Sequence, residues 1–206
     1  MRIVIVRHGI SEFNLLERTN TPYFCGSYDT PLADEGRMLA KSIENNEIIK
    51  SIEKVYSSDL SRAYETATLA KPGYKIIKTK NLRERSLGVF ENNPEMVIRK
   101  KYPEYFLDNK MVFRHDFKVK APGGENYTDV CNRAIEFLNT LDLKSDETIG
   151  IFSHYHFIRC LIYTLTGITK EELMHLKIRN CDPIVLEGTE IGKFKLISHE
   201  IKNLMM

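Results

Sequence analysis

The sequence predicts an α/β protein: a three-layer α/β/α fold with a mostly parallel central sheet, an antiparallel edge strand and a helical lid insertion. Short apolar runs alternate with amphipathic segments, which is typical of parallel strands joined by helices on both faces of a sheet. The last two apolar runs flank a turn-like stretch, 187–190, which predicts a hairpin at one edge. Residues 91–121 break the alternation with charged residues, aromatic rings and two prolines, so we expect them to form the lid.

The composition fits one globular domain over residues 1–206. The chain has 206 residues, of which 42% are hydrophobic and 28% are charged, as in ordinary globular proteins. A net charge of +2 is too small to favour nucleic acid or an anionic membrane, and no apolar run reaches the ~20 residues of a membrane span. We expect no nucleic-acid or membrane partner, and a monomer or homodimer.

The spacing of the cysteines and the first residues of the chain indicate the cellular compartment in which the protein is expected. Cys25, Cys131, Cys160 and Cys181 form no CxxC pair and fit no zinc template. The first apolar run begins at residue 3, which leaves no room for a cleavable leader. We therefore expect reduced thiols and a cytoplasmic location.

The expected strands are short and rich in β-branched or other apolar side chains, as buried strands are. They cover residues 3–6, 54–56, 75–77, 148–152, 183–186 and 193–197. Helical patterns cover 32–43, 60–70, 126–141 and 157–165, and Thr169 with Glu172 forms a capping box that predicts a further helix. Ser57, Ser58 and Asp59 are the candidate N-caps of the helix over 60–70.

Polar side chains follow four of these strands. Arg7 and His8 follow the first, Arg62 falls in the helix turn after the second, Glu84 comes after the third, and His154 follows the fourth. The carboxyl ends of parallel strands meet at one edge of a sheet, where open α/β sheets bind their ligands. The sequence therefore predicts one site with two histidines, two arginines and a carboxylate.

This set of side chains suits a phosphoryl group, which carries about two negative charges near neutral pH. Arg7 and Arg62 can bind its oxygens in a bidentate way, aided by backbone donors at the helix start near Arg62. His8 can act as a covalent nucleophile, and His154 can stabilise the transferred charge as a cation. Glu84 can give a proton to the leaving alkoxide. The scheme uses no metal and no other cofactor.

Residues 6–14 (VRHGISEFN) resemble the signature of the histidine phosphatase superfamily, also called the phosphoglycerate mutase-like family. Further motifs of that family resemble residues 28–36, 57–67, 82–91, 122–126 and 153–159, so the resemblance covers nearly the whole chain. It implies a phosphohistidine mechanism with His8 as the nucleophile. Arg7, Arg62 and His154 would complete the phosphate pocket, and Glu84 would be the general acid and then the base.

The resemblance also implies secondary contacts to phosphate or substrate. These are expected from Ser11, from Asn14 and from the backbone of Cys25 and Gly26. Tyr155 stands where the family usually has glycine, and its ring is expected to narrow or line the pocket.

Three other positions depart from the family pattern. His156 is interpreted as a structural or rim residue and not as a third catalytic histidine. Asn92 stands where glycine is frequent and is expected to alter a loop only. Ile10 replaces a commonly acidic residue.

Three functions are compatible with these motifs. A phosphatase acting on a small phosphorylated metabolite is favoured, because the stretch from Gly88 to Gly123 is shorter than in glycolytic mutases. That stretch also lacks their paired arginines at a matching place, and residues 122–126 resemble phosphatase members. The alternative is a phosphoglycerate mutase with 2,3-bisphosphoglycerate as cofactor. A non-catalytic phospho-ligand module is disfavoured, because all five site residues are present.

The basic residues of the lid allow two interpretations. They can form a cationic lid that selects substrates with a second anionic group, or a solvated basic face. The solvated face is favoured for residues 99–101, and both interpretations stay open for Arg114 and His115.

Overall fold

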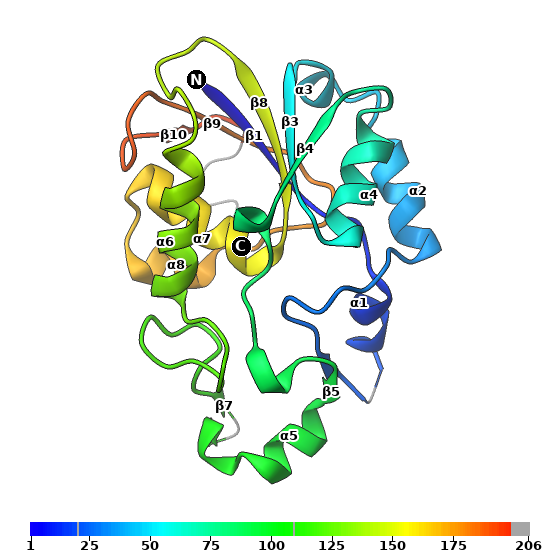
Figure 1. The fold of residues 1–206 in the computed structure, drawn as a ribbon, viewed down its shortest axis with the longest axis vertical. Coiled ribbons are helices and arrows are strands. Elements are labelled where there is room, and N and C mark those ends of the chain that lie inside the picture. The colour runs from blue at the N-terminus through cyan, green and yellow to red at the C-terminus, as the bar shows by residue number, and fades with distance from the viewer. Residues whose placement is uncertain (20, 109, 199–206) are drawn as a thin grey trace.

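The computed structural model describes residues 1–19, 21–108 and 110–198. A six-stranded sheet forms its centre, with the strand order β10-β9-β1-β8-β3-β4 (Figure 1). The strands are β1 (Arg2–Arg7), β3 (Lys54–Ser58), β4 (Ile76–Thr79), β8 (Thr148–Ser153), β9 (Ile184–Glu187) and β10 (Lys195–Leu196). Strands β1, β8, β3 and β4 are parallel, and β9 is antiparallel to both of its neighbours.

The predicted fold class is confirmed, with one refinement. The antiparallel strand β9 lies one place in from the edge, and β10 forms the edge itself through the predicted hairpin. Each expected strand is present, although several are one or two residues longer or shifted, and the last is three residues shorter.

Alternating side chains of β1 explain why the sheet is covered on both faces. Ile3 and Ile5 belong to a cluster with residues of α6 (Tyr127–Leu138), α7 (Tyr155–Thr166) and α8 (Lys170–His175). Val4 and Val6 belong to a second cluster with residues of α3 (Glu47–Lys50) and α4 (Ser61–Ala70). All four side chains are fully buried, because side chains alternate between the faces of a strand.

The helices form the two outer layers. In Figure 1, α6, α7 and α8 lie to the left of the sheet, while α3, α4 and α2 (Asp34–Ser42) lie to the right. The predicted capping box of α8 is present, with Thr169 and Glu172 bonding each other's backbone. No helix within the described ranges is long and apolar enough to cross a membrane.

The N-cap predicted for α4 is wrong. Leu60 occupies that position, and no side chain of the cap residue bonds the helix. Asp29 does so from a distant loop, because its carboxylate accepts from the N–H and hydroxyl of Ser61, each at 2.8 Å. Asp59 is engaged elsewhere, in a bidentate ion pair with Arg83. The first N–H of α4, that of Ser61, therefore already has a partner.

The lid holds less helix than the sequence predicts. It contains β5 (Asn93–Pro94), α5 (Glu95–Lys101), the 3-10 turn η3 (Pro103–Tyr105) and a hairpin of β6 (Phe106–Leu107) and β7 (Lys110–Met111). Pro103 lacks a backbone N–H and disfavours a helical residue before it, so α5 ends at Lys101 and Tyr102 leaves the helical region. Phe24, Phe90 and Phe113 form the centre of a separate apolar cluster under the lid.

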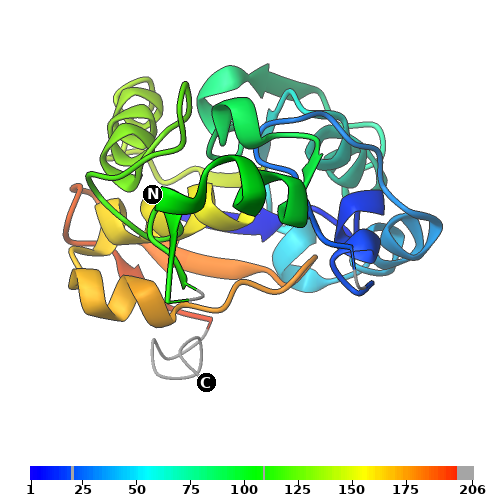
Figure 2. The same cartoon turned by 90° about the horizontal axis from the view of Figure 1, so that it is seen from below.

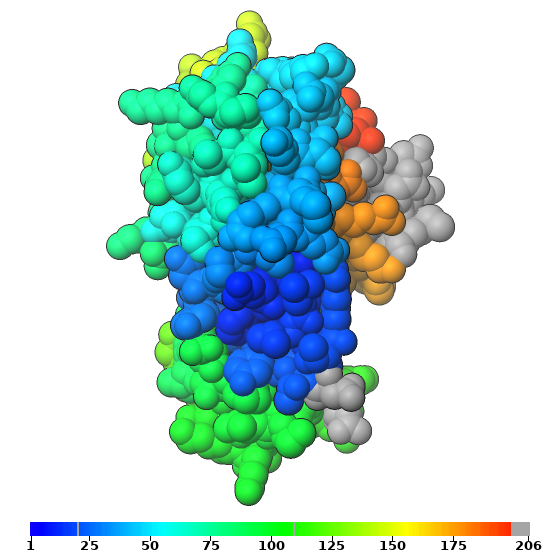
Figure 3. Space-filling model, turned by 90° about the vertical axis from the view of Figure 1, so that its right-hand side faces the viewer, coloured from blue at the N-terminus to red at the C-terminus, as the bar shows by residue number. Residues whose placement is uncertain are grey.

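The lid lies beyond the carboxyl ends of the parallel strands. Figure 2 views the molecule from that end, with the green lid in front of the sheet. Strand β2 (Tyr23–Phe24) pairs with β5 and so joins the N-terminal segment to the lid. In Figure 3 this segment, in blue, fills the space between the body of the molecule and the green lid; it includes α1 (Glu12–Leu16).

Candidate active site

The parallel strands bring the predicted residues to one place. Arg7, His8, Arg62 and Glu84 all line a cavity of about 530 Å³ between the sheet edge and the lid. His154 is fully buried, and its ring centroid lies 5.1 Å from that of His8. His154 is not among the residues that line the cavity, so it lies behind His8. We call Arg7, His8 and Arg62, together with His154 behind them, the pocket floor.

His8 is fixed in one orientation by its backbone and by both ring nitrogens. Its N–H donates to Ser153 O at 2.9 Å, and its carbonyl accepts from Asn180 at 2.7 Å. Nδ1 lies 2.6 Å from Gly9 O, and Nε2 lies 3.3 Å from Nε of Arg62. A guanidinium only donates and a carbonyl only accepts, so Nδ1 carries the proton and Nε2 holds the lone pair.

Electrostatics favour the same neutral form. Burial, followed by the charges of Arg62 and Arg7, holds the pKa of His8 well below its usual range. A neutral imidazole whose Nε2 lone pair lies beside the cavity is the form required of a nucleophile.

Two glycines allow the turn that carries His8. Gly9 donates its N–H to Thr66 Oγ1 at 2.9 Å on α4. A Cβ on Gly9 would lie 2.5 Å from Gly36 O, and one on Gly36 would lie 2.0 Å from Ile10 O. Because both obstacles are backbone atoms, neither position has room for a side chain.

The two arginines of the floor are held by carbonyl groups. Arg62 donates to Tyr28 O at 2.9 Å and to Gly26 O at 3.0 Å, and Arg7 donates to Ile178 O at 2.9 Å. Neither forms an ion pair with a carboxylate anywhere in the described parts of the chain. Their charges therefore remain available to an anion.

His154 is a buried ring with no hydrogen-bond partner in the described structure. Both Nδ1 and Nε2 are inaccessible and unpaired, which is costly unless a ligand supplies a partner. Burial, then the nearby charges of Arg62 and His8, holds the pKa of His154 well below its usual range. The ring is therefore neutral near neutral pH, and a dianion bound beside it would favour its protonation.

Glu84 lies where the loop after β4 meets the start of α7. Its carboxylate accepts from the N–H groups of Arg85 at 2.8 Å, His156 at 3.1 Å and Phe157 at 3.2 Å. These donors fix the carboxylate in the cavity wall. The arrangement gives the pocket one carboxylate that is held by backbone groups and has no ion-pair partner among the described residues.

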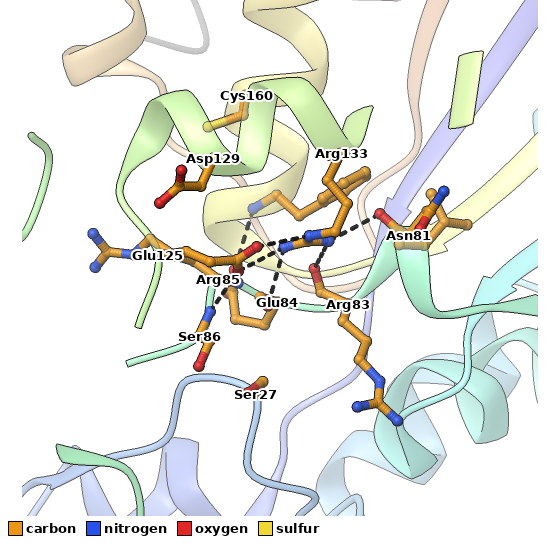
Figure 4. Close-up of polar contacts among 12 residues, drawn as sticks. Ser27, Asn81, Arg83, Glu84, Arg85, Ser86, Glu125, Asp129, Arg133 and Cys160 are labelled. Carbon is orange, nitrogen blue, oxygen red and sulfur yellow. Dashed lines mark hydrogen bonds and ion pairs between the residues drawn. The ribbon is translucent and has the colours of Figure 1, made fainter. Parts of the chain in front are cut away.

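A partly exposed ion pair holds the loop that carries Glu84. Arg133 on α6 donates to the carbonyls of Asn81 and Arg83, and pairs with Glu125 at 2.9 Å (Figure 4). It also reaches the Glu84 carbonyl at 3.4 Å. Arg133 is therefore a positioning residue for Glu84, and the sequence analysis did not identify it.

Glu91 joins two other loops at the pocket. Its Oε1 accepts from the N–H and hydroxyl of Ser27, from the Ser86 hydroxyl and from the Leu87 N–H. The Gly26–Tyr28 carbonyls that hold Arg62 are thus tied to the loop after Glu84.

The five residues expected to bind substrate all line the cavity, although some have other roles as well. Ser11 caps α1 in a capping box with Asn14. Gly26 accepts from Arg62 through its carbonyl, and Cys25 lies beside it. The Arg7 Cζ lies over the Tyr155 ring, 5.0 Å from the ring centroid. Tyr155 therefore helps to hold the Arg7 side chain as well as narrowing the pocket.

The cysteines lie in different environments, and burial makes at least two of them poor thiolates. All four are free thiols, as expected. Burial raises the pKa of Cys25 to about 11 and that of Cys181 to about 12, which disfavours reactive thiolates. No group of three or more His, Cys, Asp or Glu suited to a metal ion occurs among the residues that the structure describes.

Several pocket residues were missed or left open by the sequence analysis. Arg85 lines the cavity beside Glu84, and the available signal was its position next to the predicted acid. His156 also lines the cavity, and its Nδ1 bonds Tyr127 OH at 2.8 Å. Arg114 and His115, left open above, line the same cavity from the lid.

Comparisons with known proteins agree with this arrangement. The family model of the histidine phosphatase superfamily (branch 1) matches residues 3–200. A 2,3-bisphosphoglycerate-dependent phosphoglycerate mutase 2 of Gloeobacter violaceus is 25% identical over 203 residues, covering 95% of this chain and 89% of that protein. The corresponding mutase of Brucella canis is 29% identical over 193 residues, covering 89% and 90%.

Solved structures share the fold at lower identity. A mycobacterial glucosyl-3-phosphoglycerate phosphatase superposes with a TM-score of 0.79 at 24% identity, covering 95% of this chain and 96% of the other. The α-ribazole phosphatase of Shigella flexneri superposes with a TM-score of 0.81 at 22% identity, covering 96% and 95%. With a family match that spans nearly the whole chain, this protein belongs to the histidine phosphatase superfamily, branch 1.

Proposed function

We propose that the protein is a metal-independent phosphatase that hydrolyses a phosphomonoester of a small metabolite through a phosphohistidine on His8. The observation that carries this proposal is the pocket floor. There the neutral His8 has an unprotonated Nε2, which accepts from Nε of Arg62 at 3.3 Å, and neither Arg7 nor Arg62 forms an ion pair with a carboxylate of the described residues. A cavity of about 530 Å³ suits a small molecule.

The first chemical step is transfer to the enzyme. Nε2 of His8 attacks phosphorus, and the bond from phosphorus to the ester oxygen breaks. Arg7 and Arg62 stabilise the charge on the phosphoryl oxygens. Glu84 gives its proton to the leaving oxygen, which departs as an alcohol.

The second step returns the enzyme to its starting state. The Glu84 carboxylate takes a proton from water as the water oxygen attacks phosphorus. The phosphorus–nitrogen bond breaks, inorganic phosphate leaves, and His8 is again neutral at Nε2. His154, protonated beside the bound dianion, would stabilise both transfers.

A phosphoglycerate mutase is the second candidate. It is supported by the names of the sequence relatives from Gloeobacter and Brucella. In that reaction a hydroxyl of the substrate, and not water, would take the phosphoryl group from His8, with 2,3-bisphosphoglycerate as cofactor. The phosphatase is supported by the names of the neighbours in structure.

One experiment separates the two reactions. The purified protein is given a panel of phosphorylated metabolites with EDTA present, including 3-phosphoglycerate with and without 2,3-bisphosphoglycerate. Phosphate release and 2-phosphoglycerate formation are followed together. We expect phosphate release from one or a few compounds, unchanged by EDTA. Formation of 2-phosphoglycerate that depends on the bisphosphate, with little release, would establish the mutase instead.

A further inference from the structure

Two of the four cysteines lie together between α6 and α7. Cys131 belongs to α6 and Cys160 to α7, and both are part of the same buried apolar cluster. Cys160 is fully buried, whereas Cys131 is 8% exposed. A hydrogen bond joins the two thiols. The sulfur atoms are therefore already neighbours across the contact between the two helices.

The other two cysteines are placed differently. Cys25 lines the cavity, and its thiol donates to the Tyr28 carbonyl at 3.9 Å. Cys181 lies between α8 and β9, and its backbone N–H donates to Arg7 O at 2.9 Å. Cys131 and Cys160 are thus a pair by position, and the other two cysteines provide a comparison within the same chain.

The surroundings of the pair make its two thiols unequal. Hydrogen bonds from Cys160 and from Thr164 lower the pKa of Cys131 against the effect of burial, and the charge of Lys170 acts in the same direction. Burial raises the pKa of Cys160 well above its usual range, and the hydrogen bond with Cys131 adds to this effect. Cys131 therefore forms a thiolate more readily than Cys160, and the thiolate is the reactive form of cysteine.

Cys131 is also the thiol that a small reagent reaches first. Its neighbour Thr164 is half-buried, and Lys170, the first residue of α8, is exposed. Cys160 lies deeper, with its sulfur 4.0 Å from the Tyr127 carbonyl. A more acidic thiol near the surface, with a second thiol next to it, is the arrangement found in cysteine pairs that respond to peroxides.

The two helices that carry this pair also hold Glu84 and its loop (Figure 4). Arg133, two residues after Cys131 on α6, donates to the carbonyls of the loop and reaches the Glu84 carbonyl at 3.4 Å. N–H groups in the first turn of α7 donate to the Glu84 carboxylate. The position of this carboxylate therefore depends on how α6 and α7 lie relative to each other.

A covalent bond between the two sulfurs would change that relation. An S–S bond is about 2.05 Å long, which is shorter than a hydrogen bond between sulfur atoms. The two helices would have to approach each other at Cys131 and Cys160, and a close-packed core transmits such a shift. Because α6 holds the backbone of the loop and α7 holds the carboxylate, the shift would displace Glu84 in the pocket wall.

We propose that Cys131 and Cys160 are a redox modification site, in which a hydroperoxide forms a reversible disulfide that draws α6 and α7 together and moves Glu84 out of place. The formation of the disulfide does not depend on the proposed function. Its effect on turnover rests on that function, because Glu84 matters for turnover only as the proposed acid.

The oxidation takes place in two steps. The Cys131 thiolate attacks one oxygen of hydrogen peroxide, the O–O bond breaks, and a sulfenic acid forms while hydroxide leaves and takes up the thiol proton as water. The Cys160 sulfur then attacks the sulfenic sulfur, the S–O bond breaks, and the departing hydroxide leaves as water with the Cys160 proton. Two thiols lose two electrons, and one peroxide is reduced to two waters. A dithiol reverses the reaction by thiol–disulfide exchange.

Peptide mapping tests the disulfide on the parent protein. The reduced protein is treated with a small molar excess of hydrogen peroxide, alkylated and digested. Trypsin, which cleaves after lysine and arginine, places the four cysteines on four different peptides. We expect the loss of two of the four thiols and a linked peptide pair that contains Cys131 and Cys160. Dithiothreitol should restore all four thiols.

Rates on an alkyl and an aryl phosphate test the effect on the proposed acid. We expect oxidation to lower kcat on the alkyl phosphate by about fivefold or more, because its leaving group needs the proton of Glu84. The aryl phosphate, whose leaving group needs no proton, should change by less than about twofold. Reduction should restore the alkyl rate.

Two variants and one control assign these effects to the pair. Cys131→Ser and Cys160→Ala each remove one partner, so neither protein should form the link, and peroxide should leave the alkyl-to-aryl rate ratio of each unchanged. Cys181→Ala removes a cysteine outside the pair. It should keep both the link and the response to peroxide.

Backbone amide signals in NMR spectra report the movement without turnover. His156 and Phe157 donate their N–H groups to the Glu84 carboxylate, so we expect both signals to shift on oxidation and to return on reduction. The Ser61 N–H, which donates to Asp29, belongs to α4 in the other helical layer and should not shift.

The outcomes distinguish this inference from the proposed function. Four free thiols after peroxide treatment, or a link between any other pair of cysteines, overturns the redox site. A link between Cys131 and Cys160 that leaves either the rate ratio or the two amide signals unchanged overturns its effect on Glu84. Absence of turnover on every compound, reduced or oxidised, rejects the phosphatase, and the peptide map and the amide signals then decide the redox site alone.

Discussion

The floor of the pocket and the wall formed by Arg85, Arg114, His115 and His156, here called the distal wall, hold their cations in different ways. On the floor, Arg7 and Arg62 come directly from the ends of parallel strands or the helix that follows, and backbone carbonyls hold them. On the distal wall, Arg85 has one carbonyl partner and depends on the aromatic faces of Phe113 and Tyr127. The sheet register thus fixes the floor, whereas the distal wall depends on where the lid packs.

This difference separates two kinds of consequence. In the proposed mechanism, a change on the floor alters the contacts of the phosphoryl group, so we expect it to affect every substrate. A change on the distal wall would alter contacts beyond the ester oxygen, so we expect it to affect the choice among substrates.

The largest effect is expected on the floor. His8→Ala removes the proposed nucleophile, and kcat should fall at least about a thousandfold on all substrates. The measurement is phosphate release on the substrate panel. His175→Ala, which removes an exposed histidine from α8, is the control and should retain full activity. Residual activity of His8→Ala within tenfold of the parent would remove His8 from the mechanism.

Glu84 lies between the two regions, and its effect should depend on the leaving group. Glu84→Gln cannot donate a proton, so alkyl phosphates should slow by about a hundredfold or more. Aryl phosphates, which leave as stable phenolates, should slow by less than about tenfold. Rates on an alkyl and an aryl phosphate are compared for the parent and the variant. Equal losses on both would show that Glu84 is not the acid.

The Arg133 side chain tests whether the position of Glu84 depends on a residue behind the pocket wall. Arg133→Met removes the donors to the loop of Glu84 and keeps most of the side-chain stem. We expect kcat on alkyl phosphates to fall about tenfold to a hundredfold through misplacement of Glu84, with KM changed little. Aryl phosphates should be affected less, which loss of folded protein alone would not produce.

Two further variants make the Arg133 experiment specific. Arg133→Lys should recover part of the alkyl rate, because it restores one donor. Lys120→Met removes a cation that pairs with Asp129 at the surface and should change neither rate. A uniform loss on alkyl and aryl phosphates in Arg133→Met would contradict a positioning role.

The smallest effect concerns pH and stability. His8, His154 and His156 have pKa values held well below their usual range by burial and neighbouring cations. The unfolded chain binds protons at these rings below about pH 6.5 and the folded protein does not, so stability falls as pH falls. We expect the free energy of unfolding to drop by about 1 kcal/mol for each ring between pH 7.5 and 5.5.

Urea unfolding at the two pH values measures this drop. The same measurement with added phosphate shows how much of the drop comes from the floor. Phosphate that binds the floor should stabilise the folded protein. It should also favour protonation of His154 and so reduce the pH dependence. An unfolding free energy that is equal or higher at pH 5.5 would show that these rings are not held neutral.

The floor was largely predictable from the sequence because it depends mainly on which strands pair in parallel. Once residues 3–6 and 148–152 are strands of one parallel sheet, His8 and His154 must emerge side by side at its carboxyl edge. Arg62 and Glu84 follow from the same argument, since β3 and β4 continue the sheet in parallel.

The distal wall was not predictable in the same way. His115 and His156 meet only because Tyr127 and Arg159, on two different helices, bring them together. No local pattern encodes such contacts. The lid also contains less helix than its charge pattern suggested, because Pro103 ends α5 and leaves the rest of the segment to turns and a short hairpin.

The prediction of the N-cap of α4 was wrong for a related reason. Asp59 is a suitable cap by type and position, but Arg83 binds it in two places. Asp29, far away in the sequence, supplies the bond to Ser61 instead. Competition between partners of similar chemistry is decided by the tertiary structure, which propensity does not describe.

The position of β1 has a consequence for synthesis on the ribosome. This strand lies in the middle of the sheet, between β8 and β9, and its four central residues are apolar and fully buried in the folded protein. Both neighbours are translated much later, and the sheet around β1 cannot close before residue 187 has left the exit tunnel. The nascent chain therefore exposes this apolar strand until β8 and β9 have been made, and an exposed apolar strand favours aggregation.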